Sequence, residues 1–335
     1  MLVAARVAVL GAGSWGTALA LLLARNGHDV RLWGHDPEEV APLCRERENR
    51  RYLPGVSFPA RLNAGTDLVE ALAGVELALV AVPSHAYGAT LARLRPLLPA
   101  TAGFAWATKG LEHGSGRFLH EVTLEALGRD RSAAVISGPS FAVEVARGLP
   151  TAVTVAAWDV GHARRVAAVL HGSNLRAYTS SDVIGVELGG AVKNVLAIAA
   201  GIADGLGFGA NARAALITRG LAEMVRLGVA VGGQRETFMG LAGIGDLVLT
   251  CTDDQSRNRR FGLAIGRGDS AEAASAAIGQ VVEGAATVRE IRRLARRHGV
   301  ELPITEQVDA VLYHGQSPRR AVENLLARDP KPEGV

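Results

Sequence analysis

The sequence predicts an α/β domain with a parallel β-sheet, followed by an all-α domain. Up to about Ser181, short β-rich runs alternate with helical stretches, which is the pattern of a sheet built from βαβ units. Beyond that point the strand-like runs end, and long Ala-, Leu- and Val-rich helical patterns replace them. A chain of 335 residues with 48% hydrophobic residues can bury the cores of two domains. We expect the domains at residues 1–180 and 181–327, and a flexible tail at 328–335.

The first domain is expected to begin with a strand over Val7–Leu10, a helix over Trp15–Arg25 and a second strand over Val30–Trp33. Lys109 and Gly138 each follow the carboxyl end of a later strand, which is where open α/β sheets bind ligands. The later strands are expected at Leu77–Val82, Phe104–Ala107, Ala133–Ser137, Ala152–Ala156 and Arg176–Thr179.

The second domain is expected to be helical throughout. Pro303 and Pro318 stand where proline is common, in the first turn of a helix. The clearest helical patterns cover Val183–Ala203, Arg213–Leu227, Ala285–His298 and Thr305–His314.

Composition and charge exclude several classes of function. A formal net charge of +3 with interspersed basic residues lacks the concentrated basic surface of a nucleic-acid-binding protein, but it is compatible with an anionic small-molecule substrate. Cys44 and Cys251 lie far apart without CxxC spacing, so neither a disulfide framework nor a metal site is expected. No apolar run reaches the roughly 20 uninterrupted residues that span a bilayer, and the N-terminal run lacks the regions of a signal peptide. We expect a soluble, cytoplasmic protein that does not insert into membranes.

Lysine is rare in this chain: of 36 basic residues, only Lys109, Lys193 and Lys331 are lysines. A compact ammonium group differs from a guanidinium where it must lie close to reacting atoms or lose its proton. Lys331 lies in a Pro-rich tail, whereas Lys109 and Lys193 lie among small and apolar residues, in AWATKG and GGAVKNV. Although a biased composition is the simpler explanation, we favour a functional role for these two lysines.

Residues 11–16, GAGSWG, form a GxGxxG motif directly after the first strand and at the start of a helix. In this context Gly11 makes the tight turn, Gly13 lets the backbone approach a pyrophosphate, and Gly16 lets helix and strand pack closely. The N-terminus of the helix also offers N–H groups to the phosphates. A glycine-rich turn can be purely structural, but the strand–turn–helix context predicts a Rossmann-type dinucleotide-binding domain.

The end of the second strand bears on the choice of coenzyme. NAD-selective sites place an acidic residue there to hold the ribose hydroxyls, whereas this sequence has Gly34 followed by His35. A 2′-phosphate would meet no carboxylate at that position and could contact His35, while Asp36 keeps NAD possible. We therefore favour NADP(H), with both coenzymes accepted. The alternative is that His35, Asp36 and Pro37 simply form a turn before the next helix.

The segment VELGGAVKN places Gly189 and Gly190 one helical turn before Lys193, on the same face of a helix. A glycine inside a helix costs roughly 1 kcal/mol relative to alanine, so the pair indicates that something approaches this backbone closely. We favour a cofactor or substrate, because Lys193 and Asn194 adjoin the glycines. Tight helix–helix packing is the structural alternative.

Two motifs follow in the second domain. The sequence GIGD, which ends at Asp246, is a tight turn that delivers a carboxylate, although Asp246 can equally cap a helix. Ten residues further on, SRNRR begins at Ser256, and an arginine beside an Asn amide suits a phosphate through charge-assisted hydrogen bonds. An ordinary solvated helix surface is the alternative for this second motif.

Taken together, these segments resemble the bacterial NAD(P)-dependent glycerol-3-phosphate dehydrogenases. The resemblance extends over nearly the whole chain, in stretches such as GAGSWGTALA, ISGPSFAVEVARGLPTA, VELGGAVKNV and GDLVLTCTDDQSRNRRFG. An adjacent Lys and Asn on a glycine-flanked helix, together with the GDL and SRNRRFG segments, distinguishes this family from related β-hydroxyacid dehydrogenases. The resemblance implies a helical second domain of the 6-phosphogluconate-dehydrogenase-like type and a cytoplasmic homodimer.

The resemblance further implies the interconversion of sn-glycerol 3-phosphate and dihydroxyacetone phosphate by hydride transfer at C2, which supplies glycerol phosphate for phospholipid synthesis. It makes Lys193 the proton donor and acceptor at the C2 oxygen. The other residues that it assigns to substrate binding are Lys109, Gly138, Ser140, Asn194, Asp246, Thr250, Ser256, Arg257 and Asn258. Those that it assigns to the NAD(P) cofactor, in addition to the three motif glycines, are Ser14, Trp15, His35, Tyr52, Lys109, Ala142, Arg257, Val281 and Glu283.

A base at this oxygen must be unprotonated part of the time near neutral pH, whereas a free lysine titrates at about 10.4. Burial is expected to lower the pKa of Lys193, as are Lys109 and an oxidised nicotinamide, while Asp246 opposes the shift. The sequence does not give the balance between these effects. Two other functions remain as alternatives: a β-hydroxyacid dehydrogenase of the same architecture, and a non-catalytic NAD(P)H sensor that needs the glycine motif but not Lys193.

Overall fold

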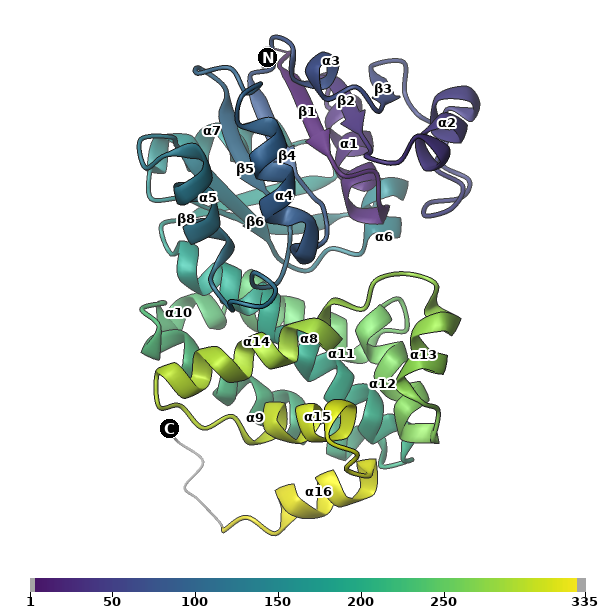
Figure 1. Ribbon diagram of the computed structural model, residues 1–335, viewed down its shortest axis with the longest axis vertical. Helices are drawn as coiled ribbons and strands as arrows, with labels where there is room; N and C mark the ends of the chain where they lie inside the picture. The colour runs from purple at the N-terminus through teal and green to yellow at the C-terminus, as the bar shows by residue number, and fades with distance from the viewer. Residues whose placement is uncertain (1–3, 330–335) are drawn as a thin grey trace. The chain divides into compact units, whose positions relative to one another are not determined.

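The computed structural model describes residues 4–329, and the chain divides into two compact units (Figure 1). Of the described residues, the first unit contains 4–108 together with 119–183, and the second contains 109–118 together with 184–329. Lys109 therefore belongs to the second unit, although it follows a strand of the first. Lys331 and most of the expected tail lie outside the described residues.

The first unit is built on one eight-stranded sheet with the strand order β3-β2-β1-β4-β5-β6-β7-β8. All neighbouring strands run parallel except β6 and β7, which are antiparallel. The strand β3 was not expected from the sequence, because only its first residue, Leu62, is buried and no apolar pattern marks it. The strands are β1 (Arg6–Leu10), β2 (Asp29–Trp33), β3 (Leu62–Gly65), β4 (Leu77–Val80), β5 (Gly103–Trp106), β6 (Ala133–Ser137), β7 (Thr151–Ala156) and β8 (Leu175–Ser180).

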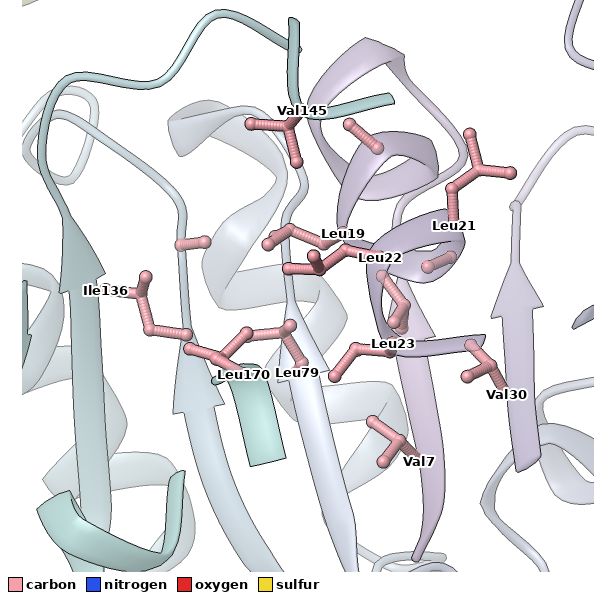
Figure 2. Packing of buried hydrophobic residues seen from close by; sticks show 14 of the residues in the cluster. Val7, Leu19, Leu21, Leu22, Leu23, Val30, Leu79, Ile136, Val145 and Leu170 are labelled. Atoms are coloured by element: carbon pink, nitrogen blue, oxygen red, sulfur yellow. The ribbon is translucent and has the colours of Figure 1, made fainter. Parts of the chain in front are cut away.

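Helices cover this sheet and bury its apolar side chains, as a mostly parallel sheet requires. Figure 2 shows Leu19, Leu22 and Leu23 of α1 packed with Leu79 of β4 and Ile136 of β6. The helix α1 also packs against α6 and α7, whereas α4 packs against α5. The helices of this unit are α1 (Ser14–Arg25), α2 (Pro37–Glu46), α3 (Leu68–Leu72), α4 (Ser84–Leu94), α5 (Leu119–Leu127), α6 (Ala142–Arg147) and α7 (Val160–Leu170).

The second unit is helical in its described residues. Its longest helix, α8, is apolar and long enough to cross a membrane by length and composition, but 94% of its most apolar window is buried inside the protein. Leu188, Val195 and Ile198 of α8 are completely buried, which makes α8 a core helix. The helices are α8 (Val183–Gly205), α9 (Gly209–Ala230), α10 (Arg235–Phe238), α11 (Asp246–Thr252), α12 (Arg257–Arg267), α13 (Ala271–Ile278), α14 (Glu283–Arg297), α15 (Pro303–Tyr313) and α16 (Pro318–Leu326), with a π-helical turn, Leu241–Gly245, before α11.

Glycines allow α8 and α12 to pack with their backbones in contact. A Cβ atom at Gly201 of α8 would lie 2.1 Å from the carbonyl oxygen of Arg259, and one at Gly262 of α12 would lie 2.1 Å from that of Ile198. No larger side chain fits at either position without moving a helix. The close approach brings the N-terminal end of α12 beside α8, and both helices carry candidate site residues.

Candidate active site

A buried carboxylate between two lysines forms the centre of the candidate site, entirely within the second unit. Lys193 Nζ donates to Asp246 Oδ1, and Lys109 Nζ donates to Asp246 Oδ2 at 2.8 Å. Lys193 Nζ also donates to Thr250 Oγ1 at 3.0 Å. Asp246 is completely buried and Lys193 is 7% exposed, whereas Lys109 is half-buried. The two lysines that stand out by their rarity therefore meet on one carboxylate.

The surroundings of Lys193 adjust its charge. Burial and, to a smaller extent, the neighbouring Lys109 lower the pKa of Lys193 from 10.5 to about 7, against the attraction of Asp246. Although burial favours a neutral Asp246, the two lysines hold the pKa of its carboxyl group below the ordinary value. The sequence did not give the balance between these effects. In the structure it favours a lysine that exchanges its proton near neutral pH, beside a carboxyl group whose pKa is lowered. Burial raises the pKa of the adjacent Cys251 thiol to about 12, so this thiol does not compete as a proton donor.

Asp246 reaches the lysines through the π-helical turn that precedes α11. A Cβ atom at Gly243 in this turn would lie 2.1 Å from the carbonyl oxygen of Phe238, so the turn has room only for glycine there. Asp246 is the first residue of α11, and Gly245 occupies the N-cap position without a side-chain hydrogen bond. The carboxylate thus binds the lysines, and the helix-capping alternative is not what the structure shows.

The same turn explains one of the two glycines before Lys193. A Cβ atom at Gly189 would lie 2.2 Å from the carbonyl oxygen of Ala242 in the π-helical turn. For Gly189 our preference for an approaching cofactor or substrate was wrong, because protein backbone already occupies that space. The structural alternative serves the site nevertheless: the missing side chain lets α8 lie against the turn that carries Asp246.

Ser256 and Arg257 form the start of α12. Ser256 is the buried N-cap residue, and its Oγ accepts a hydrogen bond from the N–H of Arg259 at 3.2 Å. Arg257 is half-buried, and its Nη1 donates to the carbonyl oxygen of Val281 at 3.1 Å. The burial of Ser256 excludes a fully solvated helix surface at this position, which was the alternative for this motif.

Two asparagines connect this helix start with the helix that carries Lys193. Asn258 Nδ2 donates to Asn194 Oδ1 at 3.0 Å, and Asn258 Oδ1 accepts from the N–H of Gly284, at the start of α14, at 2.9 Å. Both asparagines are buried. Because Asn194 follows Lys193 and Asn258 follows Arg257, this hydrogen bond fixes the amine-bearing and guanidinium-bearing segments against each other.

A buried ion-pair network supports the same helix start. Arg259 Nη2 donates to Asp204 Oδ2 at 2.6 Å, and Arg213 Nη1 binds both oxygens of Asp204 at 2.9 and 3.0 Å. Arg259 also pairs with Asp254 in the loop before α12. Arg259 is part of the SRNRR motif, but it does not share the position of Arg257 at the helix start. Arg259 is 8% exposed, and Asp204 of α8 links it to Arg213, so that this carboxylate joins α8, α9 and α12.

The glycine-rich turn of the first unit has the geometry that a dinucleotide needs. Gly11 has φ +122°, and a Cβ atom there would lie 2.8 Å from the carbonyl oxygen of Ala81. A Cβ atom at Gly16 would lie 1.8 Å from the carbonyl oxygen of Gly11, whereas one at Gly13 would meet nothing within 4 Å. The outer glycines are therefore required by packing, and the middle one leaves open space beside the start of α1. Ser14 and Trp15 begin that helix, so these residues fit a bound pyrophosphate.

The end of β2 shows why the expected acidic residue is absent. A Cβ atom at Gly34 would lie 2.4 Å from Val40 Cγ2 and 3.1 Å from the Cβ of Ala12, so a side chain has no room there. Asp36 is the N-cap of α2 and accepts a hydrogen bond from the N–H of Glu38 at 2.9 Å. Packing against Val40 therefore explains Gly34 without a coenzyme. For Asp36 the structural alternative holds, because this residue lies in a turn and caps the next helix. His35 between them is exposed.

The remaining candidates of the first unit lie in two loops. Tyr52 is half-buried, and the guanidinium of Arg51 lies 5.3 Å from the centre of its ring. Gly138 follows β6 with φ +141°, and Ser140 Oγ donates to its carbonyl oxygen at 2.9 Å. Ala142 opens α6. Gly138, Ser140 and Ala142 thus lie just after the carboxyl end of β6, where sheets of this kind bind ligands, whereas Tyr52 lies in the loop between α2 and β3.

The last two candidates belong to the second unit and lie at the start of α14. Val281 is exposed, and Glu283 is the first residue of the helix. Among residues 4–329, no group of three or more His, Cys, Asp or Glu side chains could hold a metal ion.

One residue that the sequence analysis missed is Asn49, which is 1% exposed and hydrogen bonded to the glycine-rich turn. Its sequence surroundings, RERENRRY, consist mainly of charged residues and indicate a solvated segment. Only the fold reveals that this asparagine is buried.

Comparison with known proteins agrees with both units. Residues 6–163 match the family described as NAD-dependent glycerol-3-phosphate dehydrogenase N-terminus, and residues 182–323 match the corresponding C-terminus family. The chain is 62% identical over 327 residues to glycerol-3-phosphate dehydrogenase [NAD(P)+] of Thioalkalivibrio sulfidiphilus, covering 98% of each chain. The chain belongs to the NAD-dependent glycerol-3-phosphate dehydrogenase family.

Other members of the family show the same similarity. The dehydrogenase is 58% identical over 328 residues to glycerol-3-phosphate dehydrogenase [NAD(P)+] of Stenotrophomonas maltophilia, covering 98% of this chain and 96% of the relative. The crystal structure of glycerol-3-phosphate dehydrogenase from Coxiella burnetii superposes with a TM-score of 0.94 at 51% identity, covering 97% of this chain and 99% of that one. The predicted family, the fold class of a Rossmann-type sheet followed by a helical domain, and NAD(P) dependence are confirmed. The roles of individual site residues stay predictions.

Proposed function

We propose that this dehydrogenase interconverts sn-glycerol 3-phosphate and dihydroxyacetone phosphate with NAD(P)(H). The observation that carries the proposal is the buried ammonium of Lys193, which Asp246 and Thr250 hold and whose pKa burial lowers to about 7. A general acid–base catalyst is most effective when its pKa lies near the working pH. The names of the relatives give the substrate, and the helix start with Arg257 beside this lysine suits a phosphorylated one.

Lys193 moves the proton of the reaction. When bound, the nicotinamide coenzyme supplies the hydride acceptor or donor for C2 of the substrate. In the oxidative direction the neutral amine of Lys193 takes the proton from the C2 hydroxyl, and the C2 oxygen becomes a ketone. In the reductive direction the ammonium of Lys193 polarises the ketone and returns the proton to its oxygen. Both forms are populated near pH 7, because burial lowers the pKa of Lys193 to about that value.

Asp246 and Lys109 organise this proton transfer. The two carboxylate oxygens of Asp246 bind one lysine each, so the ammonium of Lys193 has a fixed position and orientation. Lys109, bound to the other oxygen of Asp246, disfavours a second positive charge on Lys193. We infer that Lys109 binds the substrate at its reacting end and also contacts the cofactor, and that Asn194 and Thr250 complete this end of the substrate site.

The phosphate of the substrate is proposed to bind at the start of α12. Ser256 offers a hydroxyl, Arg257 a guanidinium and Asn258 an amide, at a helix N-terminus whose N–H groups favour anions. A handle remote from the reacting carbon lets binding energy position that carbon. In the first unit, Gly138 and Ser140 are proposed to contact the substrate.

The coenzyme is proposed to bind along the carboxyl ends of the strands in the first unit. The motif glycines, Ser14 and Trp15 would hold the pyrophosphate, and we infer a preference for NADP(H) from the exposed imidazole of His35 with no carboxylate at Gly34. The further residues proposed to contact it are Tyr52, Lys109, Ala142, Arg257, Val281 and Glu283. We also propose that the enzyme is a cytoplasmic homodimer that supplies glycerol phosphate for phospholipid synthesis, without nucleic-acid partners or membrane insertion.

The proposal is tested by following the oxidation of NADPH and NADH in parallel with dihydroxyacetone phosphate. Unphosphorylated dihydroxyacetone is the control, because it offers the same ketone without the group that α12 would bind. Rapid oxidation that requires the phosphate is the expected result, and the ratio of the two rates measures the coenzyme preference. Folded protein that binds NADPH but oxidises it only with β-keto acids would contradict the proposal, since that is the activity of the related hydroxyacid dehydrogenases.

A further inference from the structure

Asn49 connects two parts of the first unit that are both candidates for coenzyme binding. Its Nδ2 donates to the carbonyl oxygen of Ala12, inside the glycine-rich turn, at 2.9 Å and to Thr17 Oγ1 at 2.8 Å. Its main-chain carbonyl oxygen accepts from the N–H of Tyr52 at 3.2 Å and from that of Leu53 at 2.8 Å, and its side-chain Oδ1 accepts from the N–H of Tyr52 at 3.4 Å. Asn49 lies between α2 and β3, at a sequence distance of 37 residues from Ala12.

The contact with Ala12 orients a backbone amide of the turn. Thr17 Oγ1 donates to the same carbonyl oxygen at 3.4 Å, so Asn49 and Thr17 both direct donors to it. Because a trans peptide unit is planar, its C=O and N–H point in opposite directions. Fixing the Ala12 carbonyl toward Asn49 therefore points the N–H of Gly13 the other way, and Gly13 has open space where a side chain would stand.

The side chain of Asn49 is buried, although polar side chains usually lie on the surface. Asn49 is 1% exposed and Thr17 is completely buried, so each lost hydrogen bond would leave a polar group without water. The same asparagine holds the backbone of Tyr52, which lies beside the guanidinium of Arg51. The side chain of Asn49 thus holds the turn through Nδ2 and the N–H of Tyr52 through Oδ1.

We propose that Asn49 is a positioning residue for the coenzyme: it pre-organises the glycine-rich turn and the Tyr52 loop for the pyrophosphate and the adenosine half of NAD(P)H. The inference depends on the proposed function only in that this unit binds NAD(P)H. It assigns Asn49 no contact with the substrate and no role in proton transfer. Its removal should therefore weaken coenzyme binding while leaving the chemistry of bound substrate intact.

The test is calorimetric titration of NADPH into the full-length enzyme without substrate, for Asn49→Ala and Asn49→Asp. Asn49→Asp keeps the shape but sets a carboxylate against the Ala12 carbonyl, so it should weaken binding at least as much as alanine does. We expect Kd for NADPH to rise about tenfold, which corresponds to one lost hydrogen bond. At saturating NADPH, kcat and the KM for dihydroxyacetone phosphate should stay close to those of the wild type.

Asn26→Ala is the matched control. Asn26 is an asparagine of the same unit whose Nδ2 donates to the carbonyl oxygens of Val169, Leu170 and His171, away from the glycine-rich turn. Its loss should lower the melting temperature without changing Kd for NADPH. An equal rise of Kd in Asn26→Ala would show general loosening of the unit and overturn the inference.

The remaining outcomes separate this inference from the proposed function. Unchanged Kd in the folded Asn49 variants would overturn the inference, whereas failure of the wild type to bind NADPH would overturn the proposed function instead. Where the Asn49 variants do not fold, Thr17→Val provides the test, because it keeps the shape of the side chain and removes the hydroxyl that Asn49 and Ala12 share. A rise of Kd with unchanged kcat is expected for it, and unchanged Kd would contradict the inference.

Discussion

The substitution Gly189→Ala tests whether backbone packing, rather than a ligand, requires glycine in front of Lys193, the proposed catalytic residue. The new methyl group would lie 2.2 Å from the carbonyl oxygen of Ala242, whereas an ordinary van der Waals contact needs at least 3.4 Å. The π-helical turn or α8 must therefore shift by about 1.2 Å. Because the obstacle is backbone, no side-chain rotation can relieve the clash.

The expected cost has a structural and a catalytic part. Overpacking of this kind costs about 1–3 kcal/mol, offset in part by the roughly 1 kcal/mol that alanine gains over glycine in a helix. The melting temperature should fall by a few degrees, at roughly 2–4 °C for each kcal/mol in a chain of this size. The shifted turn directly precedes Asp246, which binds Lys193. A displacement of about 1 Å at a catalytic group can cost about a hundredfold in rate. We therefore expect kcat to fall by about two orders of magnitude in folded protein.

Gly220→Ala provides the matched control for this measurement. Gly220 is also a helical glycine of the second unit, but its new methyl group would meet the tip of the Leu196 side chain at 2.9 Å, and a side-chain tip can move. Its kcat should stay near that of the wild type. Steady-state kinetics and thermal melts of both variants decide the matter. Full activity in Gly189→Ala, or an equal loss in Gly220→Ala, would refute the argument that the backbone contact positions Asp246.

Three further predictions follow from the charges in the second unit. Because the pKa of Lys193 lies at about 7, kcat/KM for glycerol phosphate oxidation should rise with pH through that region. Lys109→Met removes a like charge and should move this rise to higher pH. An unmoved pH profile would contradict the coupling between the two lysines. Arg257→Ala should raise the KM for dihydroxyacetone phosphate by about tenfold to a hundredfold, the effect of a lost charge-assisted hydrogen bond. It should leave kcat/KM for unphosphorylated dihydroxyacetone unchanged. Equal losses for both substrates would exclude a phosphate-specific role. Burial raises the pKa of Glu223 from 4.5 to about 7, so between these pH values the folded state keeps a proton that the unfolded state has lost. The free energy of unfolding should therefore decline as pH rises through this range. Denaturant unfolding of Glu223→Gln should show a flatter pH dependence there, and parallel curves for variant and wild type would refute the assignment.

Much of the fold and of the site was predictable because the signals are local. The alternation of strands and helices, the glycines at 11, 13 and 16, and the change of texture near residue 181 each follow from short-range patterns. Lys109 and Lys193 stood out by their rarity and their apolar neighbours, and the structure joins them on Asp246. The antiparallel pairing of β7 with β6 was not predictable, because the direction of a strand is set by its pairing and not by its composition.

The sequence by itself determined the family, the two types of fold and the residues that can carry charge and protons. Only the tertiary structure decided how far the pKa values of those groups are shifted and which residues they contact. The pKa of Lys193 depends on burial and on the distances to Asp246 and Lys109, residues far away along the chain. Gly189 and Asn49 were likewise assigned by contacts with distant backbone, at Ala242 and in the glycine-rich turn. Desolvation and close packing act through space, and a linear pattern does not record which atoms fill that space.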